Sequence, residues 1–441
     1  MNNTILFDTF DTFMEVVDEG MPVTLEIDKA QLPVVFKNFN YPINSWPVVI
    51  TNELSNELEQ LSVQLPKLLQ KIPSLYFGDD IKKIANYYFQ GDEMLAQFSL
   101  LCANKLVPVS CRLDLVLTDD GYQVLEVNMG SSIGGMEFEN FEPFIRSLHP
   151  PLDRSTNDGF WSRPTQSIYI KFVVDQVLEN VSRDLKTLNV CLIGENEDER
   201  YKDEVTDFHN TILQKELEQR GMQGEVYFAH LRDLKFVNNQ LYLNDTVIHS
   251  VLILNFALNG ISPDVFRAFI LDKVYFPDHL GTHFLRDKRN LALLRELAHQ
   301  GKFSSLENQF ILKSIPWTHT MAQKQVTYQG SSYDLVTLLK DRRSEFVIKV
   351  ADGLQGMNVF VGKFLTAEEW EQAIVLALGD KPFIVQEFCN SKDLLAPDNS
   401  KSWTPHKLVW GSFGFGDHYG GCWVRMSRVG VDKGVINSAT G

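Results

Sequence analysis

The segment CRLDLVLTDDGYQVLEVN, residues 111 to 128, constrains the fold most strongly, because polar and apolar residues alternate on both sides of one turn signal. Such alternation is typical of strands with one buried face, and Asp-Asp-Gly between them predicts a β-hairpin. If these three residues form the loop, counting back along the strands pairs Asp114 with Glu126. Arg112 and Asn128 form the next pair on the same face.

This polar face suits a hard cation. Mg²⁺ takes oxygen ligands from one or two carboxylates and shares the remainder with phosphate and water. A face with two carboxylates, an amide and a guanidinium is therefore compatible with coordination of such a cation. Two alternatives stay open: the face is an ordinary solvated sheet surface, or a slip of one residue in the loop separates Asp114 from Glu126.

A second hairpin signal, FVIKVADGLQGMNVFVGKF, spans residues 346 to 364. Lys349 points away from the apolar face of its strand, and Gly353 and Gly356 lie in the turn that follows. Glycines let backbone N–H groups approach phosphate oxygens, and a lysine on a strand places charge at a fixed position. The pattern predicts a nucleotide clamp; the alternative is an ordinary turn beside a solvated lysine.

The strand PFIVQEF carries Gln386 and Glu387 within an apolar run. Buried polar side chains need partners, which the adenine edge and ribose hydroxyls of a nucleotide would supply. The alternative is an edge strand that exposes both side chains.

The 441 residues are 44% hydrophobic and 22% charged, which indicates a globular chain of two or three domains. The alternation of strand and helix signals favours the α/β class. We expect a mainly helical region at 1 to 105, with Pro66 interrupting a leucine-rich helix. Residues 106 to 186 carry the metal hairpin and a following helix, and 187 to 285 alternate strand and helix as in a small parallel α/β domain. Residues 286 to 441 hold the glycine loop and its neighbours.

The net charge of −16 argues against nucleic acid and anionic lipid as partners. Five scattered cysteines without a CxxC pair predict neither disulfides nor a zinc site, and favour a reducing cytoplasm. The N-terminal residues lack the basic flank and apolar run of a signal peptide, and no later stretch is long and apolar enough to span a membrane, so we expect a soluble intracellular protein. Its composition does not settle whether the protein forms a homodimer.

Taken together, the three motifs resemble the ATP-grasp superfamily. RLDLVLTDDGYQVLEVN looks like its metal-binding strands, VIKVADGLQGMNVFVG like its phosphate loop, and IVQEF like its adenine hinge. Here the metal strands come first, an order similar to eukaryotic glutathione synthetase and to circularly permuted, glutathionylspermidine synthetase-like ligases. The resemblance covers residues 105 to 441. It implies a circularly permuted ATP-grasp fold of α+β lobes, with an inserted Rossmann-like α/β domain.

The resemblance also assigns roles to residues. It implies that Asp114, Glu126 and Asn128 bind Mg²⁺, and that Arg112 and Arg425 act at the transferred phosphoryl group. The ATP-binding residues it implies are Lys288, Lys349, Gly353, Leu354, Gln355, Gly356, Gln386, Glu387 and Phe388. Asn437 and Gly441 resemble the closing motif, and Arg428 is a weaker substrate-binding candidate. Ser131 and Ser132 are also weaker candidates, because their hydroxyls can bind a carboxylate; the alternative is that Ser-Ser-Gly forms an ordinary turn.

The implied activity is an ATP- and Mg²⁺-dependent carboxylate–amine ligase that forms an amide through an acyl-phosphate, releasing ADP and phosphate. Its partners are a small carboxylate and an amine, such as an amino acid, a peptide or a polyamine. A kinase on a small molecule and a non-catalytic nucleotide-binding protein are the alternatives. Two segments fit less well: VLILNFAL is not followed by the arginine seen in related ligases, and GSFGFGDHYGG is either a substrate lid or a loop between strands.

Overall fold

The computed structural model describes residues 24–25, 27–36, 39, 41–149, 160–195, 199–254, 262–322, 324–353, 358–397, 403–430 and 435–436. The α-helices are α2 (Asn52–Leu69), α3 (Ile72–Phe77), α4 (Ile81–Tyr88), α5 (Glu93–Ala103), α6 (Glu142–Ser147), α7 (Thr165–Asn180), α8 (Lys202–Glu218), α9 (Pro263–Ile270), α10 (Leu280–Leu285), α11 (Arg289–His299), α12 (Ser305–Ser314), α13 (Leu335–Asp341) and α14 (Ala367–Ala377). The strands are β1 (Ser110–Thr118), β2 (Gly121–Met129), β3 (Val190–Ile193), β4 (Val226–Ala229), β5 (Leu234–Val237), β6 (Gln240–Leu243), β7 (Thr246–Val247), β8 (Ser250–Ile253), β9 (Thr318–Thr320), β10 (Gln325–Tyr328), β11 (Ser331–Asp334), β12 (Phe346–Val350), β13 (Val359–Val361), β14 (Phe383–Glu387), β15 (Asp393–Pro397), β16 (Trp403–Phe415) and β17 (His418–Arg428).

The predicted hairpin is β1 and β2, which belong to a five-stranded antiparallel sheet with β15, β16 and β17. Thr118 pairs with Gly121, so the loop holds two residues and the predicted three-residue loop is wrong. The ladder shifts by one residue between Asp114 and Leu115, where a bulge leaves Leu125 unpaired. Asp114 therefore still lies opposite Glu126, as predicted.

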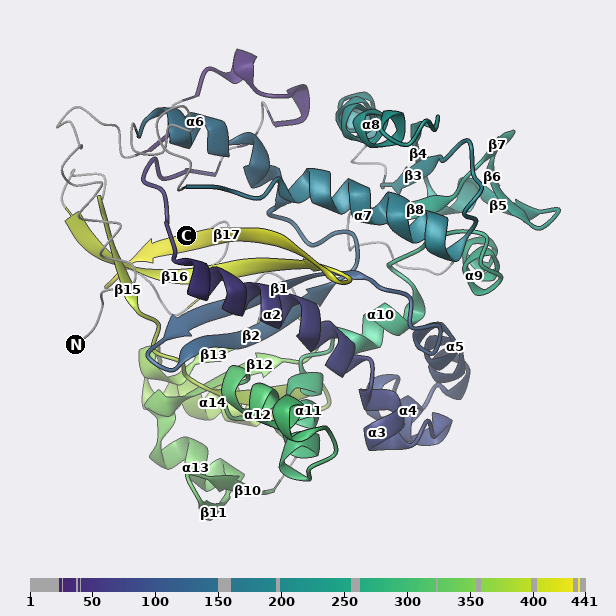
Figure 1. Ribbon diagram of the computed structural model, residues 1–441. Coiled ribbons are helices and arrows are strands. Elements are labelled where there is room, and N and C mark those ends of the chain that lie inside the picture. Colours follow the sequence, from purple (N-terminus) through teal and green to yellow (C-terminus); the bar gives the residue numbers. More distant parts are fainter. Residues whose placement is uncertain are drawn as a thin grey trace.

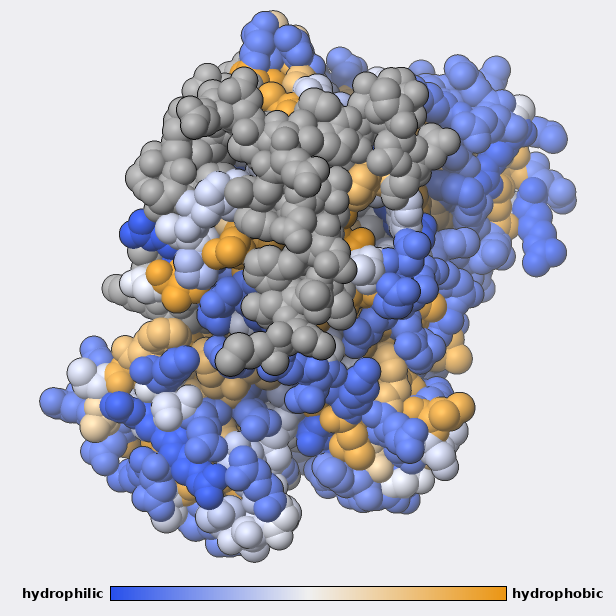
Figure 2. Space-filling model, turned by 60° about the vertical axis from the view of Figure 1, so that its left-hand side comes forward, coloured by the Kyte–Doolittle hydropathy of each residue, from blue (hydrophilic) through white to orange (hydrophobic). Residues whose placement is uncertain are grey.

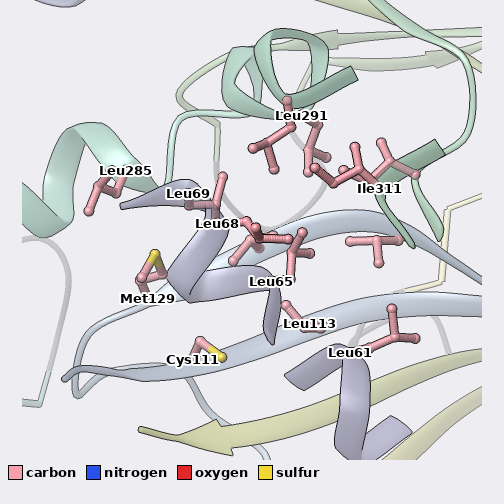
Figure 3. Packing of buried hydrophobic residues seen from close by; sticks show 14 of the residues in the cluster. Leu61, Leu65, Leu68, Leu69, Cys111, Leu113, Met129, Leu285, Leu291 and Ile311 are labelled. Atoms are coloured by element: carbon pink, nitrogen blue, oxygen red, sulfur yellow. The ribbon is translucent and has the colours of Figure 1, made fainter. Parts of the chain in front are cut away.

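Helix α2 crosses the face of this sheet and fills its core with leucines (Figures 1 and 3). The predicted interruption at Pro66 is wrong, because Pro66 lies inside α2. A proline cannot donate to the carbonyl four residues earlier, here that of Ser62. That carbonyl instead accepts from the thiol of Cys111 at 3.6 Å, and Gly414 approaches it closely enough that a Cβ would lie 2.1 Å away. The helix therefore continues through Pro66 against the sheet.

The stretch predicted to alternate strand and helix forms a three-stranded parallel sheet in the order β4, β3, β8. Helices α8 and α9 lie beside it in Figure 1, next to the small antiparallel sheet of β5, β6 and β7. The parallel pairing predicted for this stretch is confirmed. Its limits as a domain, 187 to 285, stay a prediction.

The remaining large sheet has the order β13, β12, β14, β9 and is antiparallel. Its core contains Trp370 and Ile374 from α14 and Leu338 and Leu339 from α13. Figure 1 places this lobe below the β1–β2 hairpin. Lys349 of β12 donates to the carbonyl of Leu125 in β2, so the two sheets are in contact at this point.

The segment GSFGFGDHYGG, which had two possible assignments, forms the turn and paired ends of β16 and β17. It is therefore a connection between strands. Figure 2 shows a mostly hydrophilic surface on one face of the molecule, with apolar residues in smaller groups. Within the described residues, no helix combines the length and the apolar character needed to cross a membrane.

Candidate functional site

A cavity of about 1270 Å³ lies between the five-stranded and four-stranded sheets. The predicted site residues that line it are Arg112, Asp114, Glu126, Asn128, Ser132, Lys349, Gln386, Glu387, Phe388 and Arg425. They come from β1, β2, β12, β14 and β17 and from the segments that follow β2 and β14, so residues up to 313 positions apart in the chain share one space. The structure thus brings most of the predicted set together.

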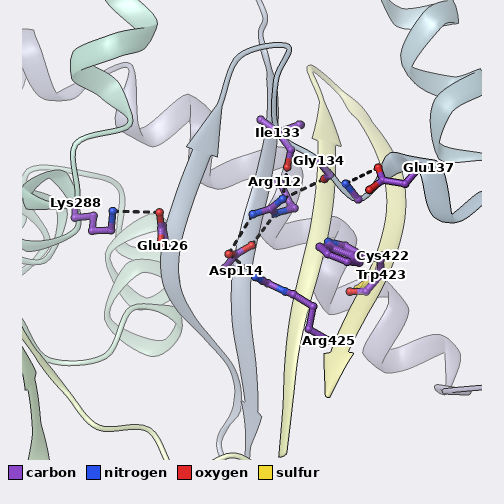
Figure 4. Close-up of polar contacts among 11 residues, drawn as sticks. Arg112, Asp114, Glu126, Ile133, Gly134, Glu137, Lys288, Cys422, Trp423 and Arg425 are labelled. Atoms are coloured by element: carbon purple, nitrogen blue, oxygen red, sulfur yellow. Dashed lines mark hydrogen bonds and ion pairs between the residues drawn. The ribbon is translucent and has the colours of Figure 1, made fainter. Parts of the chain in front are cut away.

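Asp114 is held by two arginines, which we call the arginine pair: Arg112 and Arg425 (Figure 4). Arg112 Nε donates to Asp114 Oδ1 at 2.8 Å, and Arg425 Nη2 lies 2.9 Å from Asp114 Oδ2. Burial acts to raise the pKa of this carboxyl, but the arginine pair outweighs it and holds the pKa below its ordinary value.

The two arginines differ in what their other donors contact. Arg112 also donates to the carbonyl oxygens of Ile133 and Gly134, in the loop that follows β2. Arg425 has a buried Nε without a hydrogen-bond partner among the described residues. Arg425 therefore keeps a donor that no described residue uses.

Lys288 joins the two sheets. It precedes α11, and its ammonium lies 3.1 Å from Glu126 Oε1 of β2 and donates to the carbonyl of Gly353 at 2.7 Å. The side chain of Lys288 is buried but does not line the cavity. It ties the metal hairpin to the start of the predicted phosphate loop.

Lys349 lies on β12, and its side chain reaches β2, the strand that Lys288 also contacts. Its ammonium donates to Gln386 Oε1 at 2.7 Å and to the carbonyl of the bulged Leu125 at 3.4 Å. Burial lowers the pKa of this amine to about 8, against the opposing attraction of Glu126. The bulge therefore supplies an acceptor that a regular strand would direct elsewhere.

The predicted adenine hinge has most of its groups in use. Gln386 donates to Thr318 Oγ1 at 3.1 Å as well as accepting from Lys349, so its amide positions the lysine. Glu387 accepts from the hydroxyl of Tyr328 at 3.0 Å, and the backbone N–H of Phe388 donates to the carbonyl of Glu345 at 2.7 Å. Glu387 and Phe388 nevertheless line the cavity.

Two of the weaker substrate-binding candidates, Ser131 and Ser132, form hydrogen bonds with backbone carbonyls. The hydroxyl of Ser131 donates to the carbonyl of Ile253 at 2.9 Å and to Asp278, and Ser132 donates to the carbonyl of Leu254 at 2.7 Å. These bonds anchor the loop after β2 to the end of β8. Arg428, at the end of β17, is exposed and does not line the cavity.

Some predicted residues lie outside the part of the chain that the structure describes. They are Leu354, Gln355 and Gly356 of the glycine loop and Asn437 and Gly441 of the closing motif. Gly353, at the edge of the loop, is described and is bound by Lys288.

Some residues that line the cavity were not predicted from the sequence. Trp423, two residues before Arg425, lies under the arginine pair, with its ring centroid 5.8 Å and 5.2 Å from the two guanidinium carbons. Residues 39, 41 to 44 and 46 to 50, from a region where no chemistry was predicted, also contribute. The alternation of side chains along β17 places Trp423 on the same face as Arg425, so the sequence could have predicted its position in the site. No sequence pattern indicated that the N-terminal segment lines the cavity.

The donor set of the hairpin fits Mg²⁺ in kind: two carboxylates and one amide on neighbouring strands. A cation would bind the amide oxygen of Asn128, while its buried Nδ2, which has no partner among the described residues, is a donor that an anionic group could accept from. Within the described ranges there is no group of three or more His, Cys, Asp or Glu side chains that could hold a metal. A cation at this site would therefore need the amide oxygen of Asn128, and oxygen atoms of a second bound molecule, in addition to the two carboxylates.

No family model and no curated protein matches this sequence. Solved structures that resemble it include a glutathione synthetase-like effector from Globodera pallida, at 13% identity and a TM-score of 0.48, covering 89% of this chain and 83% of that one. A putative γ-glutamylcysteine synthetase from Methylobacillus flagellatus matches at 14% identity and a TM-score of 0.42, with coverages of 88% and 87%. D-alanyl-alanine synthetase A from Vibrio cholerae matches at 16% and 0.29, covering 52% and 67%.

These structures are what the chain is similar to, in line with the resemblance predicted from the motifs. TM-scores below 0.5 and identities below 25% carry no argument about activity. The function is therefore inferred from the residues of this chain.

Proposed function

We propose that this chain is an ATP- and Mg²⁺-dependent ligase that joins a carboxylate to an amine through an acyl-phosphate. One observation carries the proposal: Lys288 and Lys349 both contact β2, at Glu126 and Leu125, while the arginine pair holds Asp114 on the neighbouring strand. Fixed cations and hard oxygen ligands at one junction suit a nucleotide triphosphate and its metal.

The order of the motifs supports a circularly permuted ATP-grasp arrangement. The metal hairpin, β1 and β2, precedes the glycine-loop strand β12 by more than 200 residues, yet both border one cavity. In this proposal the lobe with β12 and β14 holds the nucleotide, and the lobe with β1 and β2 holds the metal.

The chemistry needs no protein nucleophile. A carboxylate oxygen of the acid attacks the γ-phosphorus of ATP, the bond from that phosphorus to the β–γ bridging oxygen breaks, and ADP leaves. The amine nitrogen then attacks the acyl carbon, the bond from that carbon to the phosphate oxygen breaks, and the nitrogen loses a proton. The products are an amide, ADP and phosphate.

The residues of the chain would act by position and charge. Lys349 and Lys288 would offset phosphate charge, and Arg425 would donate its free Nε to the transferred group while Asp114 keeps it in place. Asp114, Glu126 and Asn128 would hold Mg²⁺, which when bound would supply positive charge to offset that of the phosphates and of the leaving ADP.

The alternatives differ in their products. A kinase would give a stable phosphorylated acid without an amine, and a non-catalytic binding protein would hold ATP without turnover. The test is an ADP-release screen over pools of carboxylates and amines with Mg²⁺, followed by mass spectrometry. ADP and a condensed product that both require acid and amine support the ligase. ATP binding without ADP release for any pair contradicts it.

A further inference from the structure

Four aromatic side chains form a row along one wall of the cavity. The row begins with Trp423 beneath the arginine pair, where Figure 4 shows the ring beside both arginines. Phe138 follows, with its ring centroid 5.0 Å from that of Trp423, and Phe39 lies 6.1 Å beyond Phe138. Tyr41 ends the row, 5.5 Å from Phe39. We call these four residues the aromatic row, and all of them line the cavity.

The inner end of the row is fixed by backbone on two sides. A Cβ at Gly135 would lie 2.5 Å from Trp423 Cε2, and one at Gly411 would lie 2.1 Å from Trp423 Nε1. Only glycine allows such an approach, and Gly135 also has a φ of 92°. The indole is therefore held flat between the loop after β2 and strand β16, at a set distance from the arginine pair.

The outer end of the row is open. Phe39, Phe138 and Trp423 are partly buried, and Tyr41 is 49% exposed. Apolar rings that face a water-filled cavity gain free energy when a ligand covers them, and small-molecule pockets combine such walls with a few fixed polar groups. Here the fixed polar groups are those of the arginine pair, and they lie at the buried end.

We propose that the aromatic row binds a large apolar or aromatic group of the carboxylate substrate; this rests on the proposed ligase function. The arginine pair draws the reacting carboxylate to the inner end, because its guanidinium groups are the cations next to the row. The remainder of the acid then extends over Phe138 toward Phe39. A short acid leaves these rings uncovered, so the site favours acids with a bulky apolar group.

Hydroxylamine allows a test although the natural amine is unidentified, because it captures an acyl-phosphate as a hydroxamate. The full chain is incubated with ATP, Mg²⁺, hydroxylamine and matched acids that differ by one phenyl group: propionate and 3-phenylpropionate, or L-alanine and L-phenylalanine. ADP and hydroxamate are measured together. We expect kcat/KM to be at least about tenfold higher for the phenyl-bearing acid of each pair.

Phe138→Ala should lower kcat/KM about tenfold for the phenyl-bearing acids, mainly through KM, and leave the short acids unchanged. Phe138→Leu, which keeps apolar surface, should restore part of the preference. Phe98→Ala is the matched control, because Phe98 lies on α5 away from the cavity and is 38% exposed. Thermal unfolding of each variant checks that the fold is intact.

Short acids that react as well as phenyl-bearing acids overturn this inference and leave the ligase in place. Equal losses for both acids in a folded Phe138→Ala protein also overturn it, because the ring then supports the site without choosing the substrate. If no acid yields ADP or hydroxamate although ATP binds, the proposed function fails, and this inference fails with it.

Discussion

Asp114 lies opposite Glu126 in the β1–β2 ladder because a bulge at Leu125 offsets a loop that is one residue shorter than predicted. The same bulge directs the carbonyl of Leu125 to Lys349, 3.4 Å away. One irregularity thus sets both the carboxylate pair of the hairpin and its contact with the other lobe. The predictions below test the groups that meet at this junction.

Glu126→Gln should raise the Mg²⁺ concentration needed for half-maximal ADP release by about 10- to 100-fold, because an amide is a weaker ligand for a hard cation than a carboxylate. The change also removes the charge that faces Lys288. Glu368→Gln, on the exposed face of α14, is the control and should behave as wild type. An unchanged Mg²⁺ dependence in Glu126→Gln would remove the hairpin from the metal site.

ATP affinity should fall as pH rises above about 8. The pKa of Lys349 is lowered to about 8 by burial, so the free protein loses this charge in that range, while bound phosphate favours the charged form. Binding then takes up a proton, and a single group of this kind predicts about tenfold weaker binding near pH 9 than near pH 7. Calorimetry in buffers of different ionisation enthalpy measures both the affinity and the proton uptake.

The control for this pH dependence is Lys349→Arg, because a guanidinium stays charged throughout the range. Its affinity for ATP should change little between the two pH values, whatever its absolute level. A wild-type protein without proton uptake, or a variant with the same pH dependence, would show that another group is responsible.

Arg425→Lys should lower kcat for ADP release about 100-fold, because a point charge cannot hold Asp114 and also offer the planar donors that Arg425 has. Arg428→Lys, three residues further along β17, lies outside the cavity and should stay within about twofold of wild type. Steady-state kinetics of the two variants compares them directly. Equal effects would mean that Arg425 has no special role.

Asp114→Asn should lower the free energy of unfolding by about 3 to 5 kcal/mol, because it leaves two buried arginines without their shared carboxylate. The lowered pKa of Asp114 sets the sign of the pH dependence: its stabilisation is present above its ordinary pKa of about 4 and is lost as pH falls through the lowered value. Urea unfolding should show that the difference in free energy of unfolding between wild type and Asp114→Asn is smaller at low pH than at neutral pH. A constant difference would contradict this account.

The sequence predicted what local pattern controls. Alternation gave the β1–β2 strands, the parallel pairing of β3, β4 and β8, and the strands that carry Lys349 and Gln386. It could not give the bulge at Leu125, because a two-residue and a three-residue loop fit the same letters. The correct pairing of Asp114 was thus reached from a wrong loop.

Other features depend on contacts between distant segments. Pro66 leaves the carbonyl of Ser62 without its helical donor. The thiol of Cys111 donates to that carbonyl and Gly414 packs closely against it, and neither residue is near Pro66 in the chain. The hydroxyl of Ser131, a weaker substrate-binding candidate from the sequence, instead donates to the carbonyl of Ile253 in β8. Local pattern identifies the residues of the site, and tertiary packing decides which of their polar groups remain for a ligand.

The central claim is that the carboxylate becomes an acyl-phosphate, and oxygen transfer tests it most directly. An acid accepted in the ADP-release screen is labelled with ¹⁸O in its carboxylate and turned over with ATP, Mg²⁺ and its amine. The account predicts one labelled oxygen in each phosphate released, because the phosphate leaves with the oxygen that attacked ATP. Unlabelled phosphate, or label that stays in a stable phosphorylated acid, would contradict it.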